Sequence, residues 1–239
     1  ILELPSRITT TKTRIISRNQ QMMRLDAEIT RELGSDDETR LLDSVKVYLE
    51  KEKPHAIIFQ DYNKGVLTER VIKTVIEWCK KQGVITTVDP KRKNFFTYKQ
   101  VDIFKPNLKE VKDGLNLLVD DVNRDVLDDI HHKLQQHLHH EISFITLSEK
   151  GVYYHDNKES RIIPSHLRNI ADVSGAGDTV IAVASLVYAA TRDVQLMAEM
   201  ANIAGGLVCE EVGTAAINKG RFLHECKELL PGYVVTARI

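Results

Sequence analysis

The chain has 239 residues, 42% of them hydrophobic, with 33 basic and 34 acidic side chains and a formal net charge of −1. A chain of this length and apolar content can bury a sizeable core, so it is expected to be globular and to form one α/β domain over residues 1–239. Its charges are balanced and form no basic stripe, which gives no electrostatic case for nucleic acid or an anionic membrane. A small-molecule partner is therefore expected.

Compartment signals are few. No apolar run reaches the roughly 18 residues that a membrane span needs, because Asp172 and Asp178 precede the longest run and Arg192 follows it. No signal peptide opens the chain, and its three cysteines lack metal-type spacing, so they are expected to be reduced thiols. These features favour a cytoplasmic protein.

The first patterned segment is residues 8–29, where two β-type runs flank the polar link Arg18-Asn19-Gln20. This pattern predicts a hairpin rich in threonine and charge, and therefore poorly buried. From Ser35 onward helical and strand patterns alternate. Helices are predicted at 35–53, 68–83, 122–140, 176–190, 193–211 and 219–229, and strands at 56–59, 84–90, 101–106 and 141–151. Such alternation predicts a mostly parallel sheet covered on both faces.

Polar residues follow each predicted strand, where the carboxyl ends of an open α/β sheet collect ligands. The loops concerned are residues 60–65, 89–93, 105–110 and 148–151. Any one of them needs no ligand to explain its polarity, since loops are commonly polar. Together, however, they mix carboxylates with lysines, which indicates a site for a phosphate and a cation.

Asn107 and Glu110 lie three residues apart where Pro106 ends a strand and a helix begins. Both side chains then project from the same face of the first helical turn, where a carboxylate and an amide could hold Mg²⁺ directly or through its waters. The alternative is a helix cap, with Asn107 as N-cap and Glu110 reaching back to it. The spacing alone leaves both open.

Gly175, Ala176 and Gly177 precede a long apolar helix, so a ligand can approach the backbone and the free N–H groups of the helix start. This anion cradle is neither a P-loop nor a dinucleotide fingerprint, because Asp178-Thr179 replaces Lys-Ser/Thr and the third glycine is missing. An aspartate beside a bound phosphate is repelled by it, but it can take a proton from an attacking hydroxyl. Phosphoryl transfer to an alcohol follows; the alternative is an ordinary first-turn aspartate.

The stretch Asp172 to Asp178 resembles the second signature of the ribokinase-like (PfkB) carbohydrate kinases, with Asp178 in the place of their catalytic base. Asn107 to Glu110 is similar to the family's N-x-x-E element, which is tied to Mg²⁺ and the nucleotide phosphates. Residues 146–151 and 201–217 resemble its nucleotide-binding loop and the segment that flanks adenine. The resemblance implies ATP and Mg²⁺ as cofactors, with nucleotide contacts from Asn107, Glu110, Thr146, Ser148, Glu149, Gly151 and Asn202.

Within this family the chain resembles the heptose 7-phosphate kinases, through residues 9–26, 61–68, 88–95 and 172–180. The implied reaction moves the γ-phosphoryl group of ATP to the anomeric hydroxyl of a sugar phosphate used in lipopolysaccharide core assembly. The implied fold is a ribokinase-like three-layer α/β/α sandwich with a small β lid at 8–29, through which a homodimer is expected. Candidate sugar-phosphate contacts are Lys12, Arg14, Arg24, Asp61 and Lys64.

Two expectations qualify this assignment. Family members normally carry a first strand, a glycine-rich sugar-binding segment and part of the lid before the equivalent of Ile1, so the N-terminal strands of the sheet are expected to be missing here. Another ribokinase-family sugar or nucleoside kinase, or a non-catalytic nucleotide-binding fragment, is the alternative function.

Five histidines crowd the helix predicted at 122–140 and its end: His131, His132, His137, His139 and His140. Histidine pairs on one helix face can bind a metal. The apolar ladder of Val126, Ile130, Leu134 and Leu138 instead predicts a core-facing helix, with the histidines mostly on the solvent side.

Overall fold

The computed structural model describes residues 1–18, 20–118, 122–166 and 168–233. The strands are β1 (Thr11–Ser17), β2 (Gln20–Ala27), β3 (Ala56–Gln60), β4 (Ile85–Asp89), β5 (Ile103–Phe104), β6 (Ile142–Thr146), β7 (Val152–His155) and β8 (Ser160–Ile163). The helices are α1 (Ser35–Glu52), α2 (Glu69–Gln82), α3 (Leu108–Leu115), α4 (Arg124–Leu138), α5 (Ala176–Thr191), α6 (Val194–Cys209) and α7 (Lys219–Leu229). In the described part of the chain, none of these helices is long and apolar enough to cross a membrane.

The main sheet has the order β3-β4-β5-β6-β7-β8, and its first four strands are parallel, as the alternating pattern predicts. The expected strand at 141–151 is wrong in its second half. The strand β6 ends at Thr146, and a short 3-10 turn over Ser148–Lys150 reverses the chain. The unpredicted strands β7 and β8 then pair antiparallel at the edge of the sheet.

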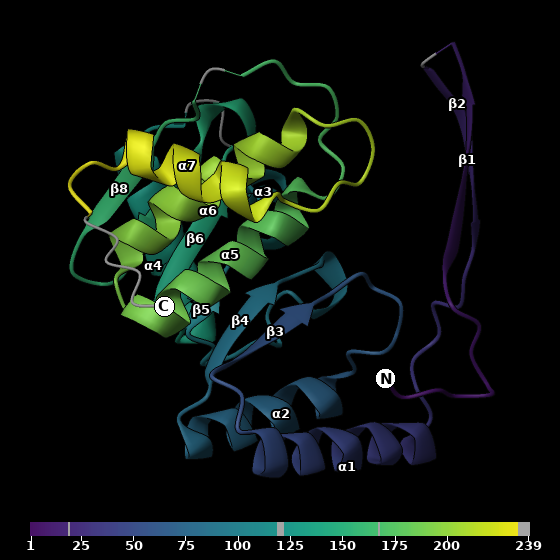
Figure 1. The fold of residues 1–239 in the computed structure, drawn as a ribbon. Helices are drawn as coiled ribbons and strands as arrows, with labels where there is room; N and C mark the ends of the chain where they lie inside the picture. Colours follow the sequence, from purple (N-terminus) through teal and green to yellow (C-terminus); the bar gives the residue numbers. More distant parts are fainter. Residues whose placement is uncertain (19, 119–121, 167, 234–239) are drawn as a thin grey trace.

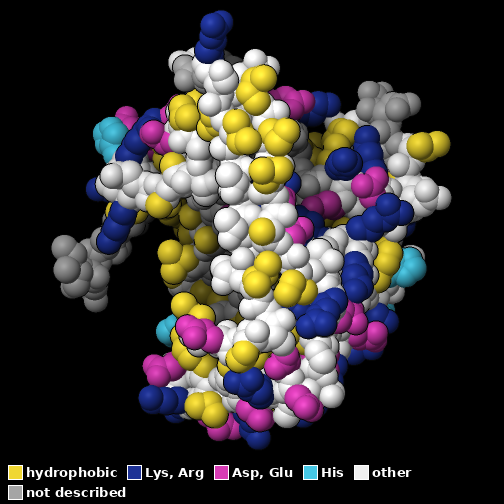
Figure 2. Space-filling model, turned by 90° about the vertical axis from the view of Figure 1, so that its right-hand side faces the viewer, with side chains coloured by type: hydrophobic (Ala, Val, Ile, Leu, Met, Phe, Trp, Pro, Cys, Tyr) yellow, Lys and Arg dark blue, Asp and Glu magenta, His cyan; other side chains and the backbone are white. Residues whose placement is uncertain are grey.

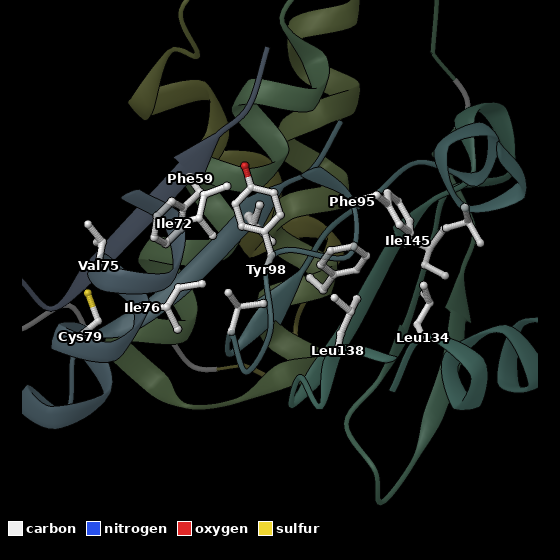
Figure 3. Close-up of a cluster of buried hydrophobic side chains, with 14 of the residues drawn as sticks. Phe59, Ile72, Val75, Ile76, Cys79, Phe95, Tyr98, Leu134, Leu138 and Ile145 are labelled. Carbon is white, nitrogen blue, oxygen red and sulfur yellow. The ribbon is translucent and has the colours of Figure 1, made fainter. Parts of the chain in front are cut away.

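Side chains that alternate along each strand build two cores, one on each face of the sheet. Phe104 and Ile145 point into the core beneath α1, α2, α3 and α4, whereas Ile103 and Phe144 face α5 and α6. Figure 1 shows the resulting three layers, with α7 outside α6, and Figure 3 shows the first core around Tyr98 and Phe95. The three-layer α/β/α expectation is thus confirmed.

The strands β1 and β2 form a separate antiparallel hairpin that stands beside the main body (Figure 1). Its register places Lys12 opposite Asp26 and Arg14 opposite Arg24 on one face. The other face carries Ile15, Met23 and Leu25, which are 47%, 53% and 55% exposed. Figure 2 looks onto the side where the hairpin lies and shows hydrophobic side chains at the surface there. The hairpin is therefore poorly buried, as predicted, and has one charged and one apolar face. Asn19 of the predicted link lies outside the described residues.

The histidines lie mostly on the solvent side, as predicted, with two exceptions. His132, His137 and His139 are exposed, but His131 and His140 are buried. The Nδ1 atom of His131 lies 2.9 Å from Ser143 Oγ, its Nε2 atom lies 3.1 Å from Asn157 Oδ1, and its ring stacks on that of His155 at 3.7 Å. These partners come from β6, β7 and the turn after β7, which the helical pattern cannot reveal. Within the described ranges, no three His, Cys, Asp or Glu side chains are grouped so that they could hold a metal ion.

Candidate active site

The carboxyl ends of β4 and β5 bring three charged side chains together. Lys105 and Asp89 are both buried and form an ion pair at 3.1 Å, and Lys91 bonds the other oxygen of Asp89 at 3.0 Å. Lys91 also contacts Glu110 at the start of α3. Burial works to lower the pKa of Lys91, but Asp89 and Glu110 outweigh it and raise that pKa. Lys91 therefore remains a cation at neutral pH, and it shares the carboxylate of Asp89 with Lys105.

The helix α5 starts against this cluster. Gly175 precedes it with φ at 83°, in the left-handed region where a side chain is strained, and the first helical bond runs from the Thr179 N–H to the Gly175 carbonyl. The N–H groups of Gly177 and Asp178 thus lie before the hydrogen-bond ladder of the helix. A Cβ atom on Gly177 would lie 3.9 Å from Lys105 Nζ, so the helix start and the lysine face the same space. The Ala176 N–H, also expected in the cradle, bonds the Val173 carbonyl instead, at 3.3 Å.

Asp178 is exposed and stands in the first turn of α5. The hydroxyl of Tyr62, from the loop after β3, lies 2.9 Å from one of its carboxylate oxygens and 2.8 Å from the other. Burial and the neighbouring Asp178 raise the pKa of Tyr62 to about 12. The phenol therefore stays protonated at neutral pH, and its O–H donates a hydrogen bond to the carboxylate. The Lys12 ammonium lies 5.4 Å from the centre of the Tyr62 ring, which links the hairpin to this corner.

The capping alternative is present at Asn107 and Glu110. Asn107 Oδ1 accepts from the Glu110 N–H at 2.8 Å, and Glu110 Oε2 accepts from the Asn107 N–H at 2.9 Å. The remaining oxygen, Glu110 Oε1, accepts from Lys91. Each of these oxygens already accepts one hydrogen bond, and contact with a metal through its bound water leaves these bonds in place.

The residues predicted to meet the nucleotide lie on neighbouring segments. Thr146 forms a parallel bridge with Asn107, so the ends of β5 and β6 adjoin. Ser148 and Glu149 lie in the following turn, and the Glu149 carbonyl accepts a hydrogen bond from Ser165. Each of these contacts binds one loop to another, and the roles of Thr146, Ser148 and Glu149 toward a nucleotide stay predictions.

Gly151 and Asn202 also have structural roles. A Cβ on Gly151 would lie 2.0 Å from the Ile163 carbonyl, and Asn202 donates to the Pro164 carbonyl at 2.9 Å. Both residues therefore fix the segment that follows β8. This packing alone accounts for a glycine and a buried amide at these positions, independently of any nucleotide.

The five predicted sugar-phosphate residues fall into two groups. Lys12, Arg14 and Arg24 share the charged face of the hairpin, and Arg24 is already paired with Asp26 at 2.8 Å. Lys12 contacts Tyr62. Hydrogen bonds from Ser174 lower the pKa of Asp172, and the positive charge of Arg14 adds a smaller effect in the same direction. The charged face is therefore turned toward the start of α5.

Asp61 and Lys64 lie deeper, in the loop after β3. Asp61 is 2% exposed and accepts hydrogen bonds from Asn63, Asn94 and Tyr98. Lys64 pairs with Glu28 at the base of the hairpin, at 2.5 Å. These contacts position the loop and the hairpin; direct contact with a substrate stays a prediction for both residues.

Sequence reasoning identified the four polar loops but did not single out Tyr62, Asp89, Lys91 and Lys105 as site residues. Their only sequence signal is position, because each lies at the end of a strand or within two residues after it. The ion pair of Lys105 with Asp89 joins residues 16 positions apart, and the hydrogen bond from Tyr62 to Asp178 joins residues 116 positions apart. Pairings over such separations do not follow from local pattern.

The sequence matches a known protein family and several curated proteins. Residues 5–219 match the family profile described as pfkB family carbohydrate kinase. The bifunctional protein HldE of Helicobacter hepaticus is 34% identical over 218 residues, which are 91% of this chain and 44% of that protein. HldE of Helicobacter acinonychis is 36% identical over 211 residues, 88% of this chain and 44% of that protein. The chain thus spans less than half the length of these curated relatives.

Solved structures show the same architecture. Phosphofructokinase-2 from Escherichia coli matches with a TM-score of 0.71 and 15% identity, over 84% of this chain and 65% of that chain. Arabidopsis thaliana ribokinase, in complex with ribose and ATP, matches with a TM-score of 0.61 and 16% identity, over 80% of this chain and 60% of that chain. These identities support the ribokinase-like fold alone. Because the family profile covers most of the sequence, the chain belongs to the pfkB family of carbohydrate kinases, phosphotransferases that act on a sugar hydroxyl.

Proposed function

We propose that the chain phosphorylates the anomeric hydroxyl of D-glycero-D-manno-heptose 7-phosphate, in the cytoplasm, as a step toward ADP-heptose and the lipopolysaccharide core. The observation that carries this proposal is the position of Asp178 beside the unbonded N–H groups of α5, with Lys12 and Arg14 on the facing side of the hairpin. The HldE relatives support the choice of sugar, since they match 91% and 88% of this chain.

Each group has a defined task in such a transfer. Asp178 accepts the proton of the sugar hydroxyl as its oxygen attacks phosphorus. The N–H groups of Gly177 and Asp178 stabilise negative charge on the transferring phosphoryl group, together with Lys105. Lys12 and Arg14 hold the phosphate that the sugar already carries, for which a guanidinium fork is well suited.

ATP supplies the γ-phosphoryl group when bound, and Mg²⁺ neutralises charge on its phosphates. The side chains fit a metal that arrives with the nucleotide better than one held by protein alone, since no cluster of three or more acidic, histidine or cysteine ligands exists among the described residues. Glu110 and Asn107 would contact such an ion, and Lys91 lies beside them for the phosphates.

A substrate panel tests this function. ATP consumption by the chain is measured with heptose 7-phosphate, unphosphorylated heptose, fructose, ribose and adenosine, each at the same concentration. We expect heptose 7-phosphate to give the highest kcat/KM. The unphosphorylated sugar should have a lower kcat/KM, mainly through a higher KM, because Lys12 and Arg14 then have no phosphate to bind. Faster turnover of ribose, fructose or adenosine would overturn the assignment.

We also propose that the hairpin forms a homodimer through its apolar face. Ile15, Met23 and Leu25 are about half exposed and lie on the face opposite the charged one, so a second copy could cover them without blocking the site. Leu25→Glu should shift the chain toward monomer in sedimentation velocity, whereas Val47→Glu, an exposed position on α1, should leave the distribution unchanged. A monomeric parent chain at high concentration would contradict this proposal.

A further inference from the structure

Tyr62 is a polar side chain that the proposed reaction leaves without a task. It stands in the loop after β3, is 45% exposed, and its hydroxyl lies within hydrogen-bond distance of both oxygens of Asp178. No other described side chain bonds this carboxylate. Because the side chain is half exposed, its hydroxyl could bond to water instead. Burial of the phenol therefore does not explain why it bonds to Asp178.

We propose that Tyr62 is a positioning residue whose hydroxyl takes the place of the sugar hydroxyl at Asp178 until a sugar binds, and so prevents Asp178 from activating water. This inference rests on the proposed function. A phenol O–H offers the carboxylate the same single donor that an alcohol offers, at 2.8 and 2.9 Å. A sugar hydroxyl can therefore replace it without leaving the carboxylate unbonded.

The chemistry that Tyr62 opposes is hydrolysis of ATP. A water oxygen would form a bond to the γ-phosphorus, the bond from that phosphorus to the bridging oxygen of ADP would break, and the water proton would pass to Asp178 and then to solvent. The products are ADP and inorganic phosphate, so no other reactant is needed. Because Asp178 is exposed, water can reach its oxygens, and the Tyr62 hydroxyl competes with that water for them.

The hairpin is placed to control this contact. Lys12 lies over the Tyr62 ring at 5.4 Å, from the same face that carries Arg14. A phosphate bound by these two cations would draw Lys12 toward itself and weaken its hold on the ring. Tyr62 is then released when a phosphorylated sugar arrives, which is when Asp178 is needed as a base.

The test measures ATP hydrolysis without sugar, and phosphoryl transfer with sugar, in the parent chain and in Tyr62→Phe. Loss of one hydrogen bond to a charged group should raise the ratio of hydrolysis to transfer by roughly tenfold to a hundredfold. Tyr48→Phe, an exposed tyrosine on α1, is the matched control and should leave the ratio unchanged. The double variant Tyr62→Phe with Asp178→Asn should lose the added hydrolysis, because its base is gone.

A second readout needs no activity. Fluorotyrosine placed at position 62 reports its own ionisation through its ¹⁹F shift, at pH values where the protein stays folded. Its pKa should lie above that of free fluorotyrosine and should fall toward it in Asp178→Asn, since that substitution removes the facing negative charge. Equal titration in both chains would overturn the inference.

The outcomes separate this inference from the proposed function. If the parent chain phosphorylates heptose 7-phosphate but Tyr62→Phe hydrolyses ATP no faster, Tyr62 is structural and the inference fails alone. If the parent chain transfers to no sugar in the panel, the proposed function fails, and the ¹⁹F titration still decides whether Tyr62 is bonded to Asp178. Raised hydrolysis in Tyr62→Phe together with normal transfer supports both.

Discussion

Asp178→Asn should reduce sugar phosphorylation by about 10²- to 10⁴-fold, the usual contribution of a positioned general base. The amide has the shape of the carboxylate and can still accept a hydrogen bond from Tyr62, but it cannot take the proton of the attacking hydroxyl. ATP should bind at least as tightly as to the parent, because the N–H groups at the start of α5 are retained and the repulsion between the carboxylate and the phosphates is removed. Initial rates at saturating ATP, with nucleotide binding measured separately, check this prediction.

The matched control is Asp125→Asn. Asp125 is also an exposed aspartate in the first turn of a helix, α4, so the substitution changes the same charge at the same kind of helix start. Its activity should equal that of the parent. Equal activity in both variants would mean that Asp178 serves only the helix dipole, and a similar loss in both would point to general destabilisation.

Acidification should destabilise the fold through the buried histidines. Burial, with the charge of His155 next, lowers the pKa of His131 to about 4, and burial with the charge of His131 lowers that of His140 to about 3. The facing carboxylate of Asp128 favours the charged form of His131 but does not outweigh burial. The unfolded imidazoles titrate near 6.5, so below this pH the unfolded chain binds protons that the folded chain does not.

The sign follows from that difference. The stabilisation is complete above pH 6.5 and is lost as pH falls from 6.5 toward 4 for His131 and toward 3 for His140. Between pH 7 and pH 5 each histidine should lower the free energy of unfolding by about 2 kcal/mol, from roughly 1.36 kcal/mol for each pH unit below 6.5. A proton gained at His140 Nδ1 also has no acceptor there, because this buried atom lacks a partner among the described residues. Urea unfolding at the two pH values measures the loss.

Variants separate this effect from general acid sensitivity. His140→Leu removes one titrating group, so its unfolding free energy should fall less between pH 7 and pH 5 than that of the parent, even if it is lower at pH 7. His224→Leu, at an exposed position on α7, should keep the parent's pH dependence. The same slope in all three chains would show that the buried imidazoles do not govern acid stability.

The central layers of the fold were predictable because local pattern determines them. Short runs rich in Ile, Val, Phe and Thr, bounded by polar loops, placed β3, β4 and β6. Gly83, with φ at 68°, ends α2 where a C-terminal glycine predicts it. The strands β7 and β8 were missed because β7 is apolar at consecutive positions and follows a polar turn, so its pairing back onto β6 leaves no alternating signature. Tertiary pairing, and not propensity, forms this edge.

The site was predictable in its parts and less so in its connections. The glycines before α5 and the spacing of Asn107 and Glu110 marked the correct loops, because helix starts have local sequence rules. The same rules could not decide between a cap and a metal ligand, and the structure has the cap. The contact of Tyr62 with Asp178 joins residues 116 positions apart, which only the folded sheet brings together.

The proposed dimer and the proposed sugar-phosphate contacts use opposite faces of the β1-β2 hairpin. If one face meets a second copy and the other meets the sugar phosphate, each event stabilises the hairpin orientation that the other requires. Because coupled binding equilibria are reciprocal, substrate then strengthens self-association, and self-association strengthens substrate binding by the same factor. The specific activity would accordingly rise with enzyme concentration and fall on dilution.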